Sequence, residues 1–464
     1  MHVPDWNGPL QLASRLASEY LAGLPARLLG PEATAESLRK ALGGQLPDHG
    51  EDASTVVREL ATAADSGLLP GGSGRFFGFV FGGATPAAIA ADWLATAWDQ
   101  NAGLHAASPA AAVVEEVAGD WLKRLLGLPD QASVGFVTGA QMASFTGLAA
   151  ARNHVLARAG WDVERSGLVG APPITIIAGD QRHDTIDRAL RFLGLGTDSI
   201  TSVASDDQGR MRADALADAL RDVSGPVVVC AQVGNVNSGA IDPVDQICDL
   251  AHEAGAWVHI DGAFGLWALS SPRLRPLLEG VQRADSWATD AHKWLSVPFD
   301  SGLVFSAHPE AHTGAMSIRA PYLIHDQEGH RDPLDYNPEF SRRARGFAVY
   351  AALRALGRSG VADVVERCCG LARLFADKLA ESSQVEILND VVLNQVLVRF
   401  LDPNGDHDAF TRQLVSRVQR DGTCWMSGTT WRGMSAMRIS VCNWTTDDED
   451  IDRSVAAIMR CLQS

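Results

Sequence analysis

Two short stretches of the sequence combine residue types that can perform covalent chemistry. Lys293 lies in the apolar stretch "ATDAHKWL", where a lysine is costly unless its amine has a chemical task. Asp261 ends the alternating run "VHID", which places it at the carboxyl end of an expected strand, where ligands bind in parallel sheets. A lysine can form a Schiff base with an aldehyde, and a carboxylate can keep a pyridine nitrogen protonated. Taken alone, each has an alternative: a surface charge for Lys293, and a helix cap or metal ligand for Asp261.

A glycine turn offers a place for a phosphate group. In "FVTGAQMASFTGLAAARN" a strand leads through the turn into a helix that starts at about Gln141. Free backbone N–H groups at a helix start, aided by the helix dipole, bind phosphate. The candidates are Thr138, Gly139, Ala140 and Gln141. Many α/β turns have this composition, and neither the dinucleotide-binding nor the P-loop glycine pattern is present.

His183 precedes an amphipathic helix in "GDQRHDTIDRALRFLGLG", with Ile186, Leu190 and Leu193 on one face. One interpretation is a histidine satisfied locally beside a helix whose N-cap is Asp184. The other is an imidazole that stacks on the flat ring of a cofactor.

The elements that must position these residues alternate between short apolar runs and helical segments. This spacing predicts an α/β domain around a mainly parallel sheet over residues 86–358. The expected strands are residues 134–138, 173–179, 225–232, 256–263, 284–290 and 301–306.

The segments on either side have different patterns. Residues 1–85 are mostly amphipathic helix without strands, so their apolar faces need another surface, such as a second subunit. Residues 359–464 alternate helices with two strands, which predicts a small α+β domain.

The composition and net charge of the chain exclude some classes of binding partner. Hydrophobic residues make up 46% and charged residues 20%, as in globular proteins, and the net charge of −17 argues against nucleic acid or anionic membrane as a partner. No apolar run is long enough for a membrane helix, and the first residues lack a signal-peptide pattern. The seven cysteines form no CxxC pair, so we expect no metal site, no disulfide framework and a cytoplasmic, reducing compartment.

Read in order, these pieces resemble the group II pyridoxal-phosphate-dependent amino-acid decarboxylases of the aromatic-L-amino-acid decarboxylase type. The resemblance is nearly end to end, and its most specific parts are "HIDGA", "ADSWATDAHKWL" and "SRRARGFAVYAALRALG". It implies a fold-type-I architecture with a mainly parallel, seven-stranded type of sheet and helices on both faces. It also implies a homodimer with active sites at the interface, and pyridoxal 5'-phosphate as the cofactor.

The resemblance assigns roles at matching positions. Lys293 would form the internal aldimine, Asp261 would pair with the pyridine nitrogen, and Ala263 and His183 would cover the two faces of the ring. Phosphate binding would involve Thr138, Gly139, Ala140 and Gln141, with His292. Tyr322, in the "PYL" setting 29 residues after Lys293, would protonate the quinonoid carbon and so favour simple decarboxylation. A loop tyrosine packed on the surface is the alternative for Tyr322.

Two departures leave the outcome of the reaction open. "GNVNSGAIDP" has Asn235, Val236 and Asn237 where the family usually has threonines, and the Asn235 amide is our candidate for the missing hydrogen bond. Asp290 stands where asparagine is common, and we expect its carboxylate to point away from the phosphate.

Substrate recognition has only indirect signals. Segments that match the family's side-chain pocket contain Phe79, Leu104 and His105, and Arg438 is in reach of a substrate carboxylate or forms a structural ion pair. An apolar pocket favours an aromatic or bulky apolar L-amino acid, with the amine and CO2 as products. Transamination, oxidative conversion to an aldehyde and a catalytically silent cofactor-binding protein remain the alternatives.

Overall fold

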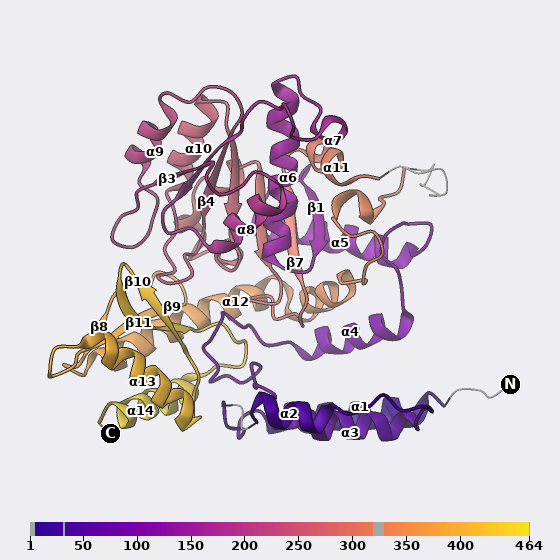
Figure 1. Ribbon diagram of the computed structural model, residues 1–464, viewed down its shortest axis with the longest axis vertical. Helices are drawn as coiled ribbons and strands as arrows, with labels where there is room; N and C mark the ends of the chain where they lie inside the picture. The colour runs from indigo at the N-terminus through magenta and orange to yellow at the C-terminus, as the bar shows by residue number, and fades with distance from the viewer. Residues whose placement is uncertain (1–4, 31–32, 319–328, 464) are drawn as a thin grey trace.

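The computed structural model describes residues 5–30, 33–318 and 329–463. A central α/β body is flanked by an N-terminal layer of helices and a small C-terminal unit (Figure 1). Tyr322 and the rest of residues 319–328 lie outside the described residues. Within the described part of the chain, no helix is long and apolar enough to cross a membrane.

The central sheet has seven strands in the order β1-β7-β6-β5-β4-β2-β3. Only β7 runs antiparallel to its neighbours, β1 and β6, and the other pairs are parallel. Its strands are β1 (Ser133–Val137), β2 (Thr175–Gly179), β3 (Ile200–Val203), β4 (Val227–Gln232), β5 (Trp257–Asp261), β6 (Ser286–Asp290) and β7 (Gly302–Ser306). Every residue of β1, β4, β5, β6 and β7 is buried, which explains their continuous apolar runs.

Helices cover both faces of this sheet. The side chains of β4 show this, since alternate residues pack into two different cores. Val228 and Cys230 belong to a core with α6 and α8, whereas Val229 and Ala231 share a core with α9 and α10. The helices of this body are α4 (Pro86–Trp98), α5 (Pro109–Leu126), α6 (Ala140–Arg158), α7 (Val163–Ser166), α8 (Asp184–Phe192), α9 (Ala213–Leu220), α10 (Val244–Glu253) and α11 (Pro309–Met316).

A long helix, α12 (Gly346–Ala380), leads into the C-terminal unit and bends at Gly357, whose φ is 64°. This unit has a four-stranded antiparallel sheet in the order β10-β11-β9-β8, with α13 and α14 packed together beside it (Figure 1). Its elements are β8 (Val385–Ile387), β9 (Gln395–Phe400), α13 (His407–Asp421), β10 (Ser427–Trp431), β11 (Met434–Ser440) and α14 (Asp448–Gln463).

The N-terminal helices α1 (Asn7–Gly23), α2 (Ala35–Leu42) and α3 (Ala53–Asp65) pack mainly on one another. They form a layer below α4 in Figure 1, and residues of α1 and α4 line one pocket. Large apolar side chains on these helices remain exposed, including Leu10 and Leu60, both at 59%.

The seven-stranded sheet, the helices around it and the small C-terminal unit confirm the expected fold class. The prediction missed β3, β8 and β10. Strands β3 and β8 have three or four residues each and β10 is half exposed, so none of the three shows a clear apolar pattern.

Candidate active site

A cavity opens at the sheet edge where β4, β5 and β6 end. The structure brings eight of the predicted site residues to its wall: Gly139, Ala140, Gln141, His183, Asp261, Ala263, His292 and Lys293. Six further residues line it: Thr185, Gln232, Gly234, Val236, Phe264 and Asp290. Parallel neighbouring strands end at one edge, and this geometry gathers residues that are far apart in the chain.

Lys293 lies on the short connection between β6 and β7. The backbone N–H groups of Ala291 and His292 both donate to the Ser301 carbonyl, at 3.1 and 3.3 Å, so the connection is closed on itself. Gly82 packs against the lysine backbone so closely that a Cβ at residue 82 would lie 1.6 Å from the Lys293 carbonyl oxygen. These contacts fix the backbone that carries the amine.

Asp290 does not point away from the cavity, so that expectation is wrong. Its Oδ1 accepts the Ala140 N–H at 2.5 Å, and its Oδ2 lies 3.3 Å from Lys293 Nζ. The N-terminus of α6 leaves N–H groups without helical partners, and the nearest carboxylate satisfies one of them. Burial tends to raise the pKa of Asp290, but Lys293, His292 and the Ala140 N–H outweigh it and lower the pKa. The carboxylate is therefore ionised at neutral pH.

Asp261 and His183 are each held by a local hydrogen bond. Asp261 is 5% exposed, and its Oδ1 accepts the Ala263 N–H at 3.2 Å. His183 is itself the N-cap of α8, where its Nδ1 accepts the Thr185 N–H at 3.2 Å. This local bond agrees with one of the two interpretations of His183, except that the cap is His183 and not Asp184. Because Nδ1 accepts that bond, the ring proton of the neutral imidazole belongs on Nε2.

Two predicted cofactor residues do not line the cavity. Thr138 is half-buried in the turn after β1. The Asn235 side chain is engaged in its own turn, where Nδ2 donates to Gln232 Oε1 at 3.1 Å and Oδ1 accepts the Asn237 N–H at 2.9 Å. Val236 reaches the cavity wall beside it.

The four predicted substrate residues also lie outside this cavity wall. Phe79 packs with Phe76, Phe81 and Trp425, and its φ of 53° is in the left-handed region. Leu104 is half-buried, and the backbone N–H of His105 donates to Asp332. In the part of the chain that the structure describes, Arg438 Nε is buried without a hydrogen-bond partner, and burial lowers the pKa of this guanidinium.

A buried ion pair supports the strand behind the glycine turn. Arg342 Nη1 donates to Glu115 Oε1 at 2.6 Å, and both side chains have no exposed surface. Arg342 Nη2 also donates to the carbonyl of Phe136 on β1, and Arg331 contacts the second Glu115 oxygen at 3.2 Å. Sequence reasoning did not identify Glu115 or Arg342, although Arg342 lies in "SRRARGFAVYAALRALG", one of the motifs that carry the family resemblance.

Comparison with known proteins places the chain and its fold in a family. The pyridoxal-dependent decarboxylase conserved domain matches residues 35–401. The chain is 28% identical to tryptophan decarboxylase 1 of Oryza sativa subsp. japonica, over 95% of this chain and 90% of the relative. It is 25% identical to 4-hydroxyphenylacetaldehyde synthase of Rhodiola rosea, over 100% of this chain and 96% of the relative. A solved structure of Oryza sativa TDC with PLP and tryptamine aligns with a TM-score of 0.92 at 25% identity, over 100% of this chain and 99% of that chain.

The chain therefore belongs to the pyridoxal-dependent decarboxylase family, and its cofactor is pyridoxal phosphate. Its relatives are named as decarboxylases, and the chain is accordingly a carboxy-lyase. The donor set fits such a cofactor, since an amine, a buried carboxylate and an imidazole surround one cavity. Asp290, at the end of β6, brings a second carboxylate to the cavity and accepts the Ala140 N–H at the start of α6. Its negative charge would repel a phosphate bound there.

Proposed function

We propose that this chain decarboxylates an aromatic or bulky apolar L-amino acid to the corresponding amine and CO2. The observation that carries the proposal is the gathering of Lys293, Asp261 and His183 around one cavity at the carboxyl edge of the sheet. When bound, pyridoxal phosphate supplies an electron sink for the bond that breaks at the substrate Cα.

The residues of this chain then have separate tasks. Lys293 holds the cofactor aldehyde through its amine, and Asp261 keeps the pyridine nitrogen protonated. His183 and Ala263 contact the two faces of the ring. Backbone groups from Gly139 to Gln141, with His292, bind the phosphate. In this proposal Thr138 and Asn235 support the neighbouring turns, since neither lines the cavity.

Tyr322 is the proposed proton donor to the substrate Cα. It lies outside the described residues, so its role rests on the family resemblance. The second candidate function is oxidative conversion to an aldehyde. Two observations favour it: Val236 brings no hydroxyl to the cavity wall, and relatives include proteins named 4-hydroxyphenylacetaldehyde synthase and phenylacetaldehyde synthase.

We also propose a cytoplasmic homodimer that assembles through residues 1–85 and α4. The exposed apolar side chains of α1, α3 and α4 support this arrangement. A partner chain would also bring the segments with Phe79, Leu104 and His105 towards the cavity, as substrate-pocket residues. All seven cysteines are buried and form no disulfide, which fits a reducing compartment.

A screen of L-amino acids with pyridoxal phosphate, measuring CO2 and identifying the second product, tests the function. We expect amine and CO2 in equal amounts from an aromatic substrate. A keto acid or an aldehyde as the main product would overturn simple decarboxylation. Lys293→Ala is expected to lose both turnover and the visible absorbance of the protein-bound cofactor. An unchanged absorbance band in Lys293→Ala would contradict the role of this lysine.

Tyr322→Phe, assayed in parallel, tests the proton donor. We expect decarboxylation to slow by at least about a hundredfold, the usual contribution of a general acid, with aldehyde among the products. Wild-type amine production by this variant would remove Tyr322 from the mechanism.

A further inference from the structure

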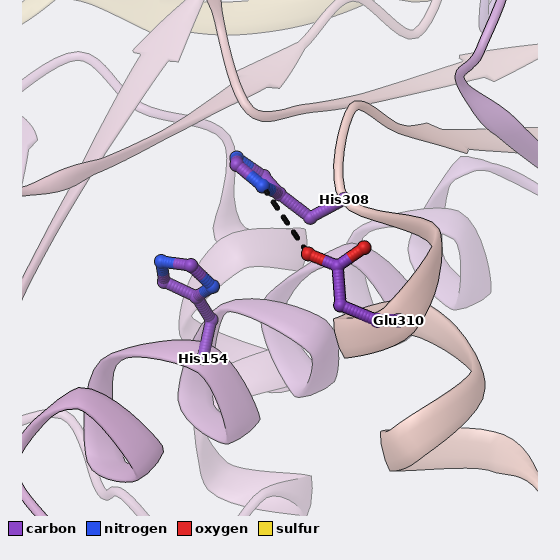
Figure 2. A group of neighbouring side chains, drawn as sticks. All are labelled: His154, His308 and Glu310. Carbon is purple, nitrogen blue, oxygen red and sulfur yellow. Dashed lines mark ion pairs between the residues drawn. The ribbon is translucent and has the colours of Figure 1, made fainter.

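A second group of chemically active side chains lies at the opposite edge of the sheet from Lys293. His308 follows the end of β7, next to the start of β6, where Ser306 pairs with Ser286. His154 comes from the C-terminal half of α6, and Glu310 from the first turn of α11. Figure 2 shows the two imidazoles and the carboxylate pointing towards one another. None of the three lines the active-site cavity.

The spacing of the three side chains suits a single ion. One ligand atom from each residue lies within 4.8 Å of the others, and His308 Nδ1 is 3.7 Å from Glu310 Oε1. Zinc bonds of about 2.0–2.1 Å in a tetrahedral site bring ligand atoms to roughly 3.3 Å from one another. Binding would therefore draw the ligand atoms together by up to about 1.5 Å, and Glu310 is exposed and so can rotate.

The surroundings orient the ligands. His308 Nε2 donates to Asp285 Oδ1 at 2.7 Å, which leaves Nδ1 on the side of Glu310. A histidine that ligates a metal through one nitrogen usually donates the other N–H to a carboxylate, as here. Both imidazole rings also pack against the Trp257 indole, with centroid distances of 5.2 Å for His154 and 4.9 Å for His308.

His154 is prepared to act as a neutral ligand. Burial lowers the pKa of His154, whereas the hydrogen bond to Asp285 raises the pKa of His308, so an ion at this site would displace a proton from His308. An uncharged imidazole offers the lone pair that a metal ion needs. This property adds to the geometry of the three ligand atoms.

We propose that His154, His308 and Glu310 bind one divalent transition-metal ion of the zinc type, with water at the remaining position. The ion ties α6 to the start of α11 and lies outside the catalytic cavity. The sequence prediction of no metal site rested on cysteine spacing, and this cluster uses no cysteine. Its histidines are also far apart in the chain, so no local motif marks them.

Titration of the pyridoxal-phosphate-loaded protein with Zn²⁺, followed by calorimetry, tests the site. The test variants are His154→Ala and Glu310→Gln. The matched control is His252→Ala, because His252 contacts the same Asp285 at 3.2 Å without belonging to the cluster. We expect one saturable Zn²⁺ site, weakened about tenfold or more in each test variant and changed by less than about twofold in the control.

Co²⁺ gives a second readout. Bound to wild type and to His252→Ala, it should show the visible absorption of a nitrogen-ligated ion, and His154→Ala should lose that absorption while keeping the bound cofactor. Two results would overturn the proposal: no saturable Zn²⁺ binding by wild type, or equal Zn²⁺ affinity in His154→Ala and His252→Ala. The cofactor absorbance in the same samples reports separately on the proposed function.

Discussion

Asp290 sets the charge at the end of the cavity where a phosphate would bind. Its carboxylate accepts the Ala140 N–H and contacts Lys293, and in the proposed function both of these groups bind the cofactor. A dianionic phosphate must compete with this carboxylate or displace it.

We predict that Asp290→Asn strengthens binding of pyridoxal phosphate by about tenfold, because one negative charge beside the phosphate is removed. Equilibrium titration by absorbance measures the affinity. Pyridoxal, which lacks the phosphate but also reacts with Lys293, should gain less affinity from the substitution than pyridoxal phosphate does. Asp242→Asn is the control, since Asp242 is also buried and accepts backbone N–H groups but does not line the cavity. An equal gain for pyridoxal would refute the charge argument.

At the scale of single residues, the local sequence predicted a site residue where that residue follows the end of a strand. Asp261 and Lys293 could be singled out from the strands before them, and the structure brings both to one cavity. The direction of Asp290 could not be predicted, because its partner Ala140 is 150 residues away in the chain. The N-cap at His183 was missed because an imidazole is an unusual acceptor at that position.

At the scale of elements, the pair of Glu115 and Arg342 joins α5 to β1 and to the segment before α12. Both side chains are fully buried, so removing one partner leaves an uncompensated charge. Glu115→Ala should lower the free energy of unfolding by about 3–5 kcal/mol, measured by urea denaturation.

Glu19→Ala is the comparison for that variant, because it breaks the exposed pair of Arg15 and Glu19. Its expected loss is roughly 0–1 kcal/mol, since water screens an exposed pair. Similar losses in the two variants would mean that the buried pair contributes no more than a surface pair.

Most elements of the central sheet were predictable, because strands buried on both faces have continuous apolar runs. The edge strand β3 was missed, since Thr201 and Ser202 are exposed and interrupt the pattern. The antiparallel direction of β7 was also invisible, because burial on both faces produces the same sequence pattern in either direction.

At the scale of the whole molecule, the described part of the chain leaves large apolar side chains of the N-terminal helices exposed, as the amphipathic pattern led us to expect. The amphipathic sequence indicated the need for a covering surface but carried no information on its identity. In the proposed homodimer, that surface belongs to a second copy of the chain.

We therefore predict that the double variant Leu10→Asp/Leu60→Asp shifts the protein from dimer to monomer, because each new charge would be buried at the interface. Sedimentation velocity over a range of concentrations measures the shift. Val169→Asp, at an exposed apolar residue of the α/β body, should leave the dimer intact. A dimer of unchanged stability in the double variant would exclude these helices from the interface.

The reversed direction of β7 has a consequence for how the lysine is held. Asp290 pairs with Gly302, so the connection between them, residues 291–301, begins and ends at the same edge of the sheet. After β6, an all-parallel sheet would send the chain to the far edge before the next strand. Here β6 and β7 hold the two ends of the connection side by side. The connection therefore loses its conformational entropy during folding rather than on cofactor binding. We therefore expect the amides of Ala291 and His292 to exchange with solvent as slowly as those of the sheet, with or without cofactor.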